Sequence, residues 1–243
     1  MKNKNLKVIY QALFYLSFLY LCACVTPTYI ETDYVVYPLS KVTKKDRNRE
    51  IVVLIIDTID LKKLKYLKKI RSYSCGNGNK RASVKAAIEM LSKLDSVPQL
   101  DIRYLDSIPS NIVKLKGLRD LAIINADMEE LPEFIGQLDQ LYLLMVGYSS
   151  AVGCGDHYSG KHRIKKLPDS FSKLKNLEYL ALAGTDITTF PKVLCELKKL
   201  SYLDIRRTNI DSIPDCICNT KKTIDSYQDT LLSKLPCKTS MRN

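Results

Sequence analysis

Three residues near the middle of the chain have side chains that could bind a metal or act in catalysis. Cys154, His157 and His162 follow the pattern C-x2-H-x4-H. A structural zinc site needs four ligands, so Asp156 or Cys75 would have to complete the set. A cysteine–histidine nucleophile pair also needs a group that orients the base and donors for an oxyanion, and neither is evident here. We therefore predict a polar loop with a disulfide, without metal, cofactor or catalytic residues.

No other motif in the sequence indicates an enzyme. The chain has no glycine-rich phosphate loop before Lys-Ser or Lys-Thr, no H-E-x-x-H and no G-x-S-x-G. The sequence therefore favours a protein that binds other molecules over one that catalyses a reaction.

Apolar residues recur with a period of 23 residues in the second half of the chain. Each unit reads approximately L-x-x-L-x-x-L-x-L-x-x-T-x-I-x-x-I-P-x-x-I, and together the units cover residues 94–219. One unit is shorter than the period and one is longer. The five units begin at Leu94, Leu115, Leu138, Leu174 and Leu197.

This pattern resembles the leucine-rich repeat of the 23-residue class. The resemblance implies an α/β fold, a right-handed leucine-rich-repeat solenoid with a parallel concave β-sheet and an irregular or short-helical convex side. The L-x-L step is then a strand, and the proline opens the return across the convex side. The residues expected to refill the core after the proline are Ile112, Ile135, Phe171, Leu194 and Ile217.

One position departs from the family pattern. Where the family usually has Asn, which satisfies backbone groups of the turn, this chain has Ala126, Ser149, Thr185 and Thr208. Ser and Thr can substitute weakly for Asn, whereas Ala126 cannot. We therefore expect a less rigid ladder at the second unit.

The longer unit contains an insertion within residues 149–163. Insertions in solenoids map to loops on one face, which is often the binding face. Residues 24–93 are expected to form a linker and capping region, with a strand at Ile51 to Ile56 and a helix at Arg81 to Leu94. Residues 220–243 are expected to form a C-terminal cap with a short helix near Ile224 to Leu232.

Residues 1–23 have the pattern of a signal peptide. A positively charged segment at residues 2–7 precedes an apolar run at residues 8–21, which is shorter than the roughly 20 residues that a membrane-spanning helix needs. The run ends in Leu21-Cys22-Ala23-Cys24, which resembles the bacterial lipobox and implies lipidation of Cys24. We expect a lipoprotein of the bacterial cell envelope, facing the periplasm or the surface. A secreted protein is the alternative.

Six further cysteines in an exported chain suggest disulfides. Cys195 and Cys218 lie 23 residues apart, in the same place of adjacent units. Stacked units approach to about 5 Å, which suits the separation of about 4.4 to 6.8 Å between disulfide α-carbons. Alternatively, both are simply small residues, like Gly136 and Ser172 in the same place. The predicted pairs are Cys195 with Cys218, Cys216 with Cys237, and Cys75 with Cys154.

The outward strand positions form columns across successive units, and the centre of these columns is apolar and aromatic. Tyrosine and arginine are favoured in the desolvated centre of protein interfaces. We therefore expect a protein ligand on the concave face. The candidate binding residues are Leu143, Met145, Tyr148, Tyr179, Tyr202, Asp204 and Arg206.

Composition and charge limit the alternatives. Hydrophobic residues make up 46% of the chain, which is enough for a buried core. The formal net charge of +12 favours anionic partners. The alternatives are an acidic glycan or envelope polymer, bound by the basic flanks Arg103, Arg206 and Arg207, or a purely structural envelope component. Nucleic acid is not expected for an exported chain, and the repeat pattern does not name the partner.

Overall fold

The fold is taken from a computed structural model of the chain. The chain divides into two compact units, and the elements below all belong to the unit formed by residues 34–148 and 160–243. The structure describes residues 35–38, 43–46, 51–54, 72–75, 81–103, 105–115, 117–124, 126–147, 163–217 and 223–225.

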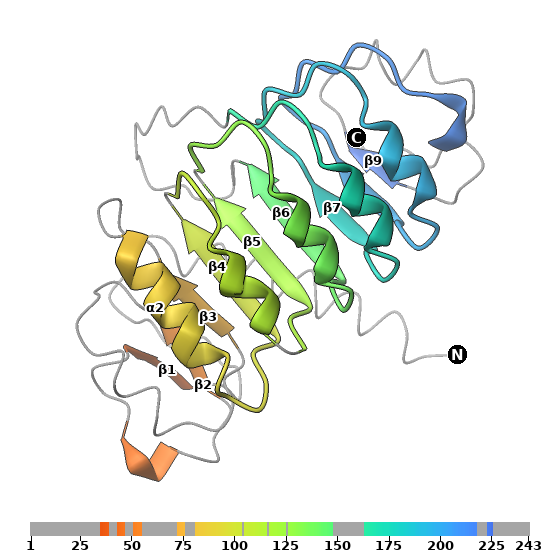
Figure 1. The fold of residues 1–243 in the computed structure, drawn as a ribbon. Helices are drawn as coiled ribbons and strands as arrows, with labels where there is room; N and C mark the ends of the chain where they lie inside the picture. Colours follow the sequence, from red (N-terminus) through yellow and green to blue (C-terminus); the bar gives the residue numbers. More distant parts are fainter. Residues whose placement is uncertain are drawn as a thin grey trace, which may run out of the picture. The chain divides into compact units, whose positions relative to one another are not determined.

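The described strands form one parallel sheet of nine strands, which lie in the order of the sequence from β1 to β9 (Figure 1). Each strand pairs only with its neighbours along the chain, so the sheet is a simple ladder. The strands are β1 (Val35–Pro38), β2 (Ile51–Leu54), β3 (Ser72–Cys75), β4 (Gln99–Arg103), β5 (Asp120–Ile124), β6 (Leu143–Gly147), β7 (Tyr179–Ala181), β8 (Tyr202–Asp204) and β9 (Thr223–Asp225).

Short helices run back along one side of this ladder (Figure 1). Helix α2 (Arg81–Leu91) precedes β4, and each later return contains a 3-10 helix that directly follows a proline. Proline fixes its own φ, and its carbonyl oxygen accepts the first hydrogen bond of the helix. The 3-10 helices are η4 (Ser110–Lys114), η5 (Glu133–Gln137), η6 (Asp169–Lys173), η7 (Lys192–Glu196) and η8 (Asp215–Ile217), and η2 (Lys44–Asp46) lies in the N-terminal region.

The core lies between the sheet and these helices. One leucine from each of strands β4 to β8 is completely buried, and so is the third residue of each 3-10 helix from η4 to η8. These helix residues are the ones that the repeat pattern predicted to refill the core, so this prediction is confirmed. The strand residues are Leu100, Leu121, Leu144, Leu180 and Leu203, and the helix residues are Ile112, Ile135, Phe171, Leu194 and Ile217.

The N-terminal region contributes more to the sheet than its sequence indicated. Strand β2 and helix α2 confirm the strand and the helix expected there, and Val84, Ala87, Ile88 and Leu91 form the buried face of the helix. Strands β1 to β3 also continue the ladder beyond the first repeat. At the other end, Thr223–Asp225 is a strand paired with β8, where we expected a helix to begin. No helix among the described residues is long and apolar enough to cross a membrane.

Two threonines occupy the place where the family usually has Asn, and they satisfy backbone groups as expected. The hydroxyl of Thr185 donates to the Leu182 carbonyl oxygen at 2.8 Å, and that of Thr208 donates to the Ile205 carbonyl oxygen at 2.7 Å. Ala126 is also buried but has no side-chain group to make this bond. The turn at the second unit therefore lacks a hydrogen bond that the two later turns possess.

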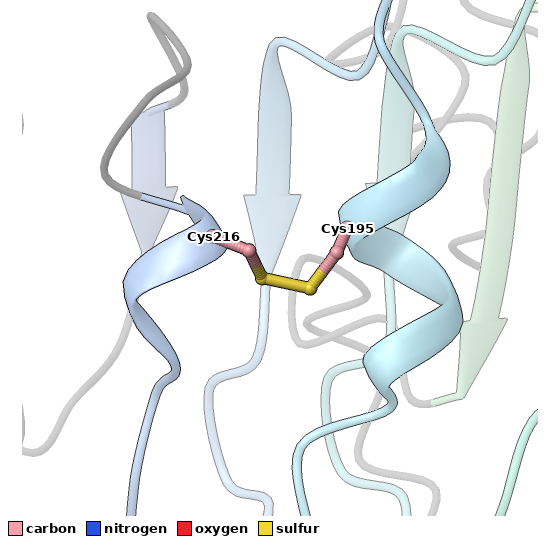
Figure 2. Close-up of a disulfide and its surroundings, with 2 residues drawn as sticks. All are labelled: Cys195 and Cys216. Carbon is pink, nitrogen blue, oxygen red and sulfur yellow. A yellow bond between two sulfur atoms is a disulfide. The ribbon is translucent and has the colours of Figure 1, made fainter.

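The disulfide of the repeats differs from the predicted one. Cys195 in η7 is bonded to Cys216 in η8, with 5.6 Å between their α-carbons (Figure 2). The predicted pairs of Cys195 with Cys218 and of Cys216 with Cys237 are therefore wrong. The remaining predicted pair, Cys75 with Cys154, lies outside the described residues because Cys154 is not among them.

The error has a geometric cause. Equivalent residues of stacked helices point in the same direction, so a residue that faces the next helix meets a different position of that helix. The bond joins the fourth residue of η7 to the second residue of η8. The same two positions meet two helix pairs earlier, where a Cβ atom on Gly136 of η5 would overlap Ser170 of η6. Contacts between return helices therefore join positions 21 residues apart in an uninterrupted repeat.

Candidate functional site

The predicted columns of outward residues are present in the sheet. Leu143 of β6 pairs with Tyr179 of β7, which pairs with Tyr202 of β8. Met145 pairs with Ala181 in the next column. All five side chains are partly exposed. They form a continuous part of the face of the sheet that is turned away from the core, which we call the outer face and which corresponds to the predicted concave face. Tyr148, the remaining aromatic candidate, lies outside the described residues.

The backbone at the start of strands β5 to β8 turns two consecutive side chains outward. The N–H groups of Tyr142 and Leu143 both donate to the Arg119 carbonyl oxygen, at 2.8 and 2.9 Å. Two residues of one strand thus oppose one residue of its neighbour, as in a β-bulge. The same arrangement recurs where β5, β7 and β8 begin. It explains how the buried Leu141 and Leu144 can both face the core although two residues separate them.

This backbone arrangement adds two residues to the site that the sequence did not predict. Tyr142 directly precedes β6, and Arg119 directly precedes β5. Strict alternation along a strand would turn both side chains away from the outer face. The ring of Tyr142 lies 5.2 Å from that of Tyr179 between centroids, and the Arg119 guanidinium lies 5.3 Å from the centre of the Tyr142 ring. The L-x-x-L spacing was the signal, because both intervening residues must leave the core.

Three tyrosines therefore form a continuous row across strands β6 to β8, and we call Tyr142, Tyr179 and Tyr202 the tyrosine row. The rings of Tyr179 and Tyr202 lie 6.0 Å apart and are tilted by 34°. Contacts of this geometry between aromatic rings are favourable, and Arg119 adds a cation–π contact at one end. The row presents a partly exposed aromatic surface whose rings hold one another in place.

The Tyr142 side chain is partly buried. Burial raises the pKa of Tyr142 above its ordinary value, and the hydrogen bond with the Tyr179 hydroxyl raises it further. The phenol is therefore neutral throughout the physiological range. It can take part in hydrogen bonds to a ligand but cannot serve as an anionic base near neutral pH.

The charged candidates at the end of β8 bind each other. Asp204 accepts hydrogen bonds from the Arg206 side chain at 2.9 and 2.6 Å and from the Arg206 backbone N–H at 3.0 Å. Asp204 is buried and Arg206 is partly exposed. Bidentate pairs of this kind fix both side chains. The positive charge of Arg206 is thus neutralised by Asp204. This pairing disfavours the binding of an acidic glycan at this flank. Asp101, another outward strand residue, is completely buried.

The insertion returns to the ladder at a cluster of ion pairs. Arg163 contacts Asp127 and Glu129 at 3.5 and 2.8 Å, and Lys165 contacts Glu129 at 3.1 Å. The hydrogen bond from Lys165 lowers the pKa of the Glu129 carboxyl, so this group is ionised at neutral pH. Lys166 pairs with Glu130 in the same cluster. These contacts fix the point at which the chain rejoins the sheet.

The possible metal ligands of the insertion lie outside the described residues, as does the lipidation candidate Cys24. They are Cys154, His157 and His162. In the part of the chain that the structure describes, no three His, Cys, Asp or Glu side chains come together in a way that could hold a metal ion.

A single parallel ladder with proline-initiated helical returns and a leucine-filled interior defines a leucine-rich-repeat solenoid. The chain therefore has the leucine-rich-repeat fold that the sequence pattern predicted. Solved structures of bacterial proteins of this class are similar to it. No protein-family model matches the chain, and no curated protein matches its sequence.

Three of the similar structures show the extent of the likeness. The leucine-rich-repeat domain of the type III effector XCV3220 (XopL) is 21% identical over 56% of this chain and 46% of its own, with a TM-score of 0.45. The protein LIC12759 of Leptospira interrogans is 21% identical over 68% of this chain and 45% of its own, with a TM-score of 0.41. Internalin C2 of Listeria monocytogenes is 14% identical over 83% and 84%, with a TM-score of 0.45. The chain spans less than half the length of the first two, and these likenesses concern the fold alone.

Proposed function

We propose that this chain is a non-enzymatic interaction module that holds a protein ligand on the outer face of its sheet. The observation that carries the proposal is the tyrosine row, which lies beside the partly exposed Leu143 and Met145. Tyrosine side chains supply much contact area with few rotatable bonds and are enriched where protein interfaces are strongest. The row therefore offers the centre of an interface.

Pre-organisation supports the same proposal. The three rings contact one another, and the strands that carry them are joined by continuous backbone pairing. Side chains that are already ordered lose less conformational entropy when a ligand binds. A ligand that covers the row would also remove water from an aromatic surface, which favours association.

Replacing two tyrosines of the row tests the proposal. The Tyr179→Ala, Tyr202→Ala double variant should lose capture of a cross-linked protein partner from an envelope extract, because it removes most of the aromatic contact area. Its circular dichroism spectrum should match that of the unchanged chain, since both side chains lie on the outer face. The matched control is Tyr179→Phe with Tyr202→Phe, which keeps both rings and should retain most of the capture. Unaltered capture by the alanine variant would contradict the proposal.

We also propose that the protein is exported and anchored to a membrane of the bacterial cell envelope through a lipid on Cys24. The support for this is the charged and apolar N-terminal segment followed by Leu21-Cys22-Ala23-Cys24. Anchoring by two or more acyl chains gives stable membrane attachment, which would hold the binding face close to partners in the same envelope.

A further inference from the structure

We infer that the protein ligand contacts the tyrosine row through an extended acidic segment that crosses the strands, with a carboxylate bound to Arg119. This inference rests on the proposed function and adds the chemistry of the partner. It follows from the direction of the row and from the exposed Arg119 side chain. It also follows from the distribution of charge at the two edges of the sheet, where the strands begin and where they end.

The direction and spacing of the row suit an extended peptide. The row runs from Arg119 before β5 through Tyr142 and Tyr179 to Tyr202 on β8, so it lies across the strands. Successive ring centroids are 5.2 and 6.0 Å apart. In an extended chain, side chains on one face recur about every 6.6 Å. Alternate side chains of one extended segment could therefore rest on successive tyrosine rings.

Arg119 is positioned to bind a carboxylate. Its side chain is exposed, and it forms no ion pair among the residues that the structure describes. The Tyr142 ring supports its guanidinium from one side at 5.3 Å, which reduces the conformational freedom that the side chain would lose on binding. A guanidinium that is already held in place can form two parallel hydrogen bonds with one carboxylate.

The edge at which the strands begin carries excess positive charge. Among the described residues of the turns that lead into β5 to β8 and the first residues of these strands, four cations stand against the three carboxylates of Asp120, Asp139 and Glu178. Lys199 donates a hydrogen bond to the Asn176 side chain at 2.6 Å, and the other three cations form no ion pair with described residues. The four cations are Arg119, Lys175, Lys198 and Lys199.

The opposite edge is different at residues 163–166, where three cations are already neutralised. Arg163, Lys165 and Lys166 all form ion pairs with carboxylates of the preceding unit. An acidic segment would therefore be attracted to the edge beside the tyrosine row and would gain little from these three paired cations. Charge complementarity of this kind sets which partner binds and how fast it associates.

Selection from a displayed library of short random peptides on the full chain provides the probe. Selected peptides should be enriched in Asp or Glu next to proline, aromatic or aliphatic residues. The Kd of a selected synthetic peptide should rise about tenfold in the Arg119→Gln variant, which removes the charged contact. Arg163→Gln is the matched control: it removes an exposed arginine from the other edge and should leave the Kd unchanged. Binding should weaken as salt is added, because the contact is partly exposed.

The outcomes separate this inference from the proposed function. Peptides that lose binding in the Tyr179→Ala, Tyr202→Ala variant, but show no acidic enrichment and no response to Arg119→Gln, would overturn the inference and leave the proposed function standing. Peptides indifferent to both sets of changes would overturn both. Failure to select any peptide, or capture of an acidic or neutral glycan on the row instead, would overturn the inference.

Discussion

Gly147 ends strand β6 immediately before the insertion, and its backbone conformation suits no other residue. Its φ is +122°, and a Cβ atom placed on it would overlap the carbonyl oxygen of Ala183 in the next unit. Glycine adopts positive φ without steric cost and permits this close approach between neighbouring backbones. The residue thus allows the chain to leave the sheet for the insertion without separating β6 from the unit that follows.

Replacing Gly147 by alanine should destabilise the fold more than the same change at Gly117. Gly117 also has a positive φ, +74°, but the nearest atom to a Cβ there is the Ser96 hydroxyl oxygen at 3.8 Å. Gly117→Ala should therefore cost only about 1 kcal/mol for the backbone conformation. Gly147→Ala should cost about 1 to 3 kcal/mol more because of the overlap. Urea unfolding followed by tyrosine fluorescence measures both, and equal losses would refute the role of the close approach.

The site was predictable from the sequence where side chains obey strand alternation. Leu143, Tyr179 and Tyr202 were placed in one column by the repeat period, and the sheet confirms that column. Tyr142 and Arg119 were missed because the bulge at each strand entry breaks the alternation. The Asp204–Arg206 pair was also missed. The repeat period shows which residues of neighbouring strands lie side by side, but it does not show which side chains of one segment bind each other.

At the scale of elements, the disulfide joins the last two return helices that the structure describes. It links η7 to η8 on the helical side, opposite strand β8 with its Tyr202. In a solenoid each unit is stabilised only by its neighbours, so a terminal unit separates from the stack more readily than a central one. The bond between Cys195 and Cys216 opposes that separation and so helps to keep Tyr202 in the row.

Removing the bond should loosen the end of the stack. The Cys195→Ser, Cys216→Ser double variant should lose about 3 kcal/mol of stability, the value typical for a loop of this length. Amide hydrogen exchange should accelerate in Tyr202–Asp204, whereas Asp120–Ile124 should keep its protection. Ser172→Ala in η6, at the position equivalent to Cys195, serves as a control and should leave both rates unchanged. Unaltered exchange in β8, or a peptide map that links Cys195 to Cys218, would disprove the assignment.

The repeat period predicted strands β4 to β8 and the buried residue of each return helix, because leucines at fixed spacing must share one interior. It could not predict that β1 to β3 would continue the ladder. Parallel pairing between strands uses backbone groups, so a segment can join the sheet without carrying the leucine spacing. The period also misled the disulfide assignment, because equal spacing identifies equivalent positions rather than positions that face each other.

At the scale of the whole molecule, the tyrosine row lies in the C-terminal half of the described ladder, one strand from its end. Strands β1 to β5 precede it and β9 follows it. Units inside a stack are supported on both sides, which keeps the strands of the row in fixed register. The net charge of +12 includes three lysines of the proposed signal peptide, and the +9 that remains without them favours acidic partners in the same sense as Arg119 does locally.

Mass spectrometry of the mature protein tests the proposed export and anchoring. The protein extracted from the membrane fraction should begin at Cys24 and carry a diacylglycerol group on that residue. Cys24→Ser should abolish both cleavage at this site and recovery from membranes, because the acceptor thiol is gone. Cys22→Ser changes a neighbouring thiol and should leave processing intact. A mature chain that begins elsewhere, or that retains an unmodified Cys24, would argue against the anchor.

The offset between Cys195 and Cys216 has a consequence for how such a protein could grow. A segment with cysteine at both the second and the fourth place of its return helix could be copied end to end. Each copy would then offer one thiol forward and one backward, and neighbouring copies could crosslink without any further change in sequence. Gene duplication alone would extend the molecule as a stack of repeats joined by disulfides.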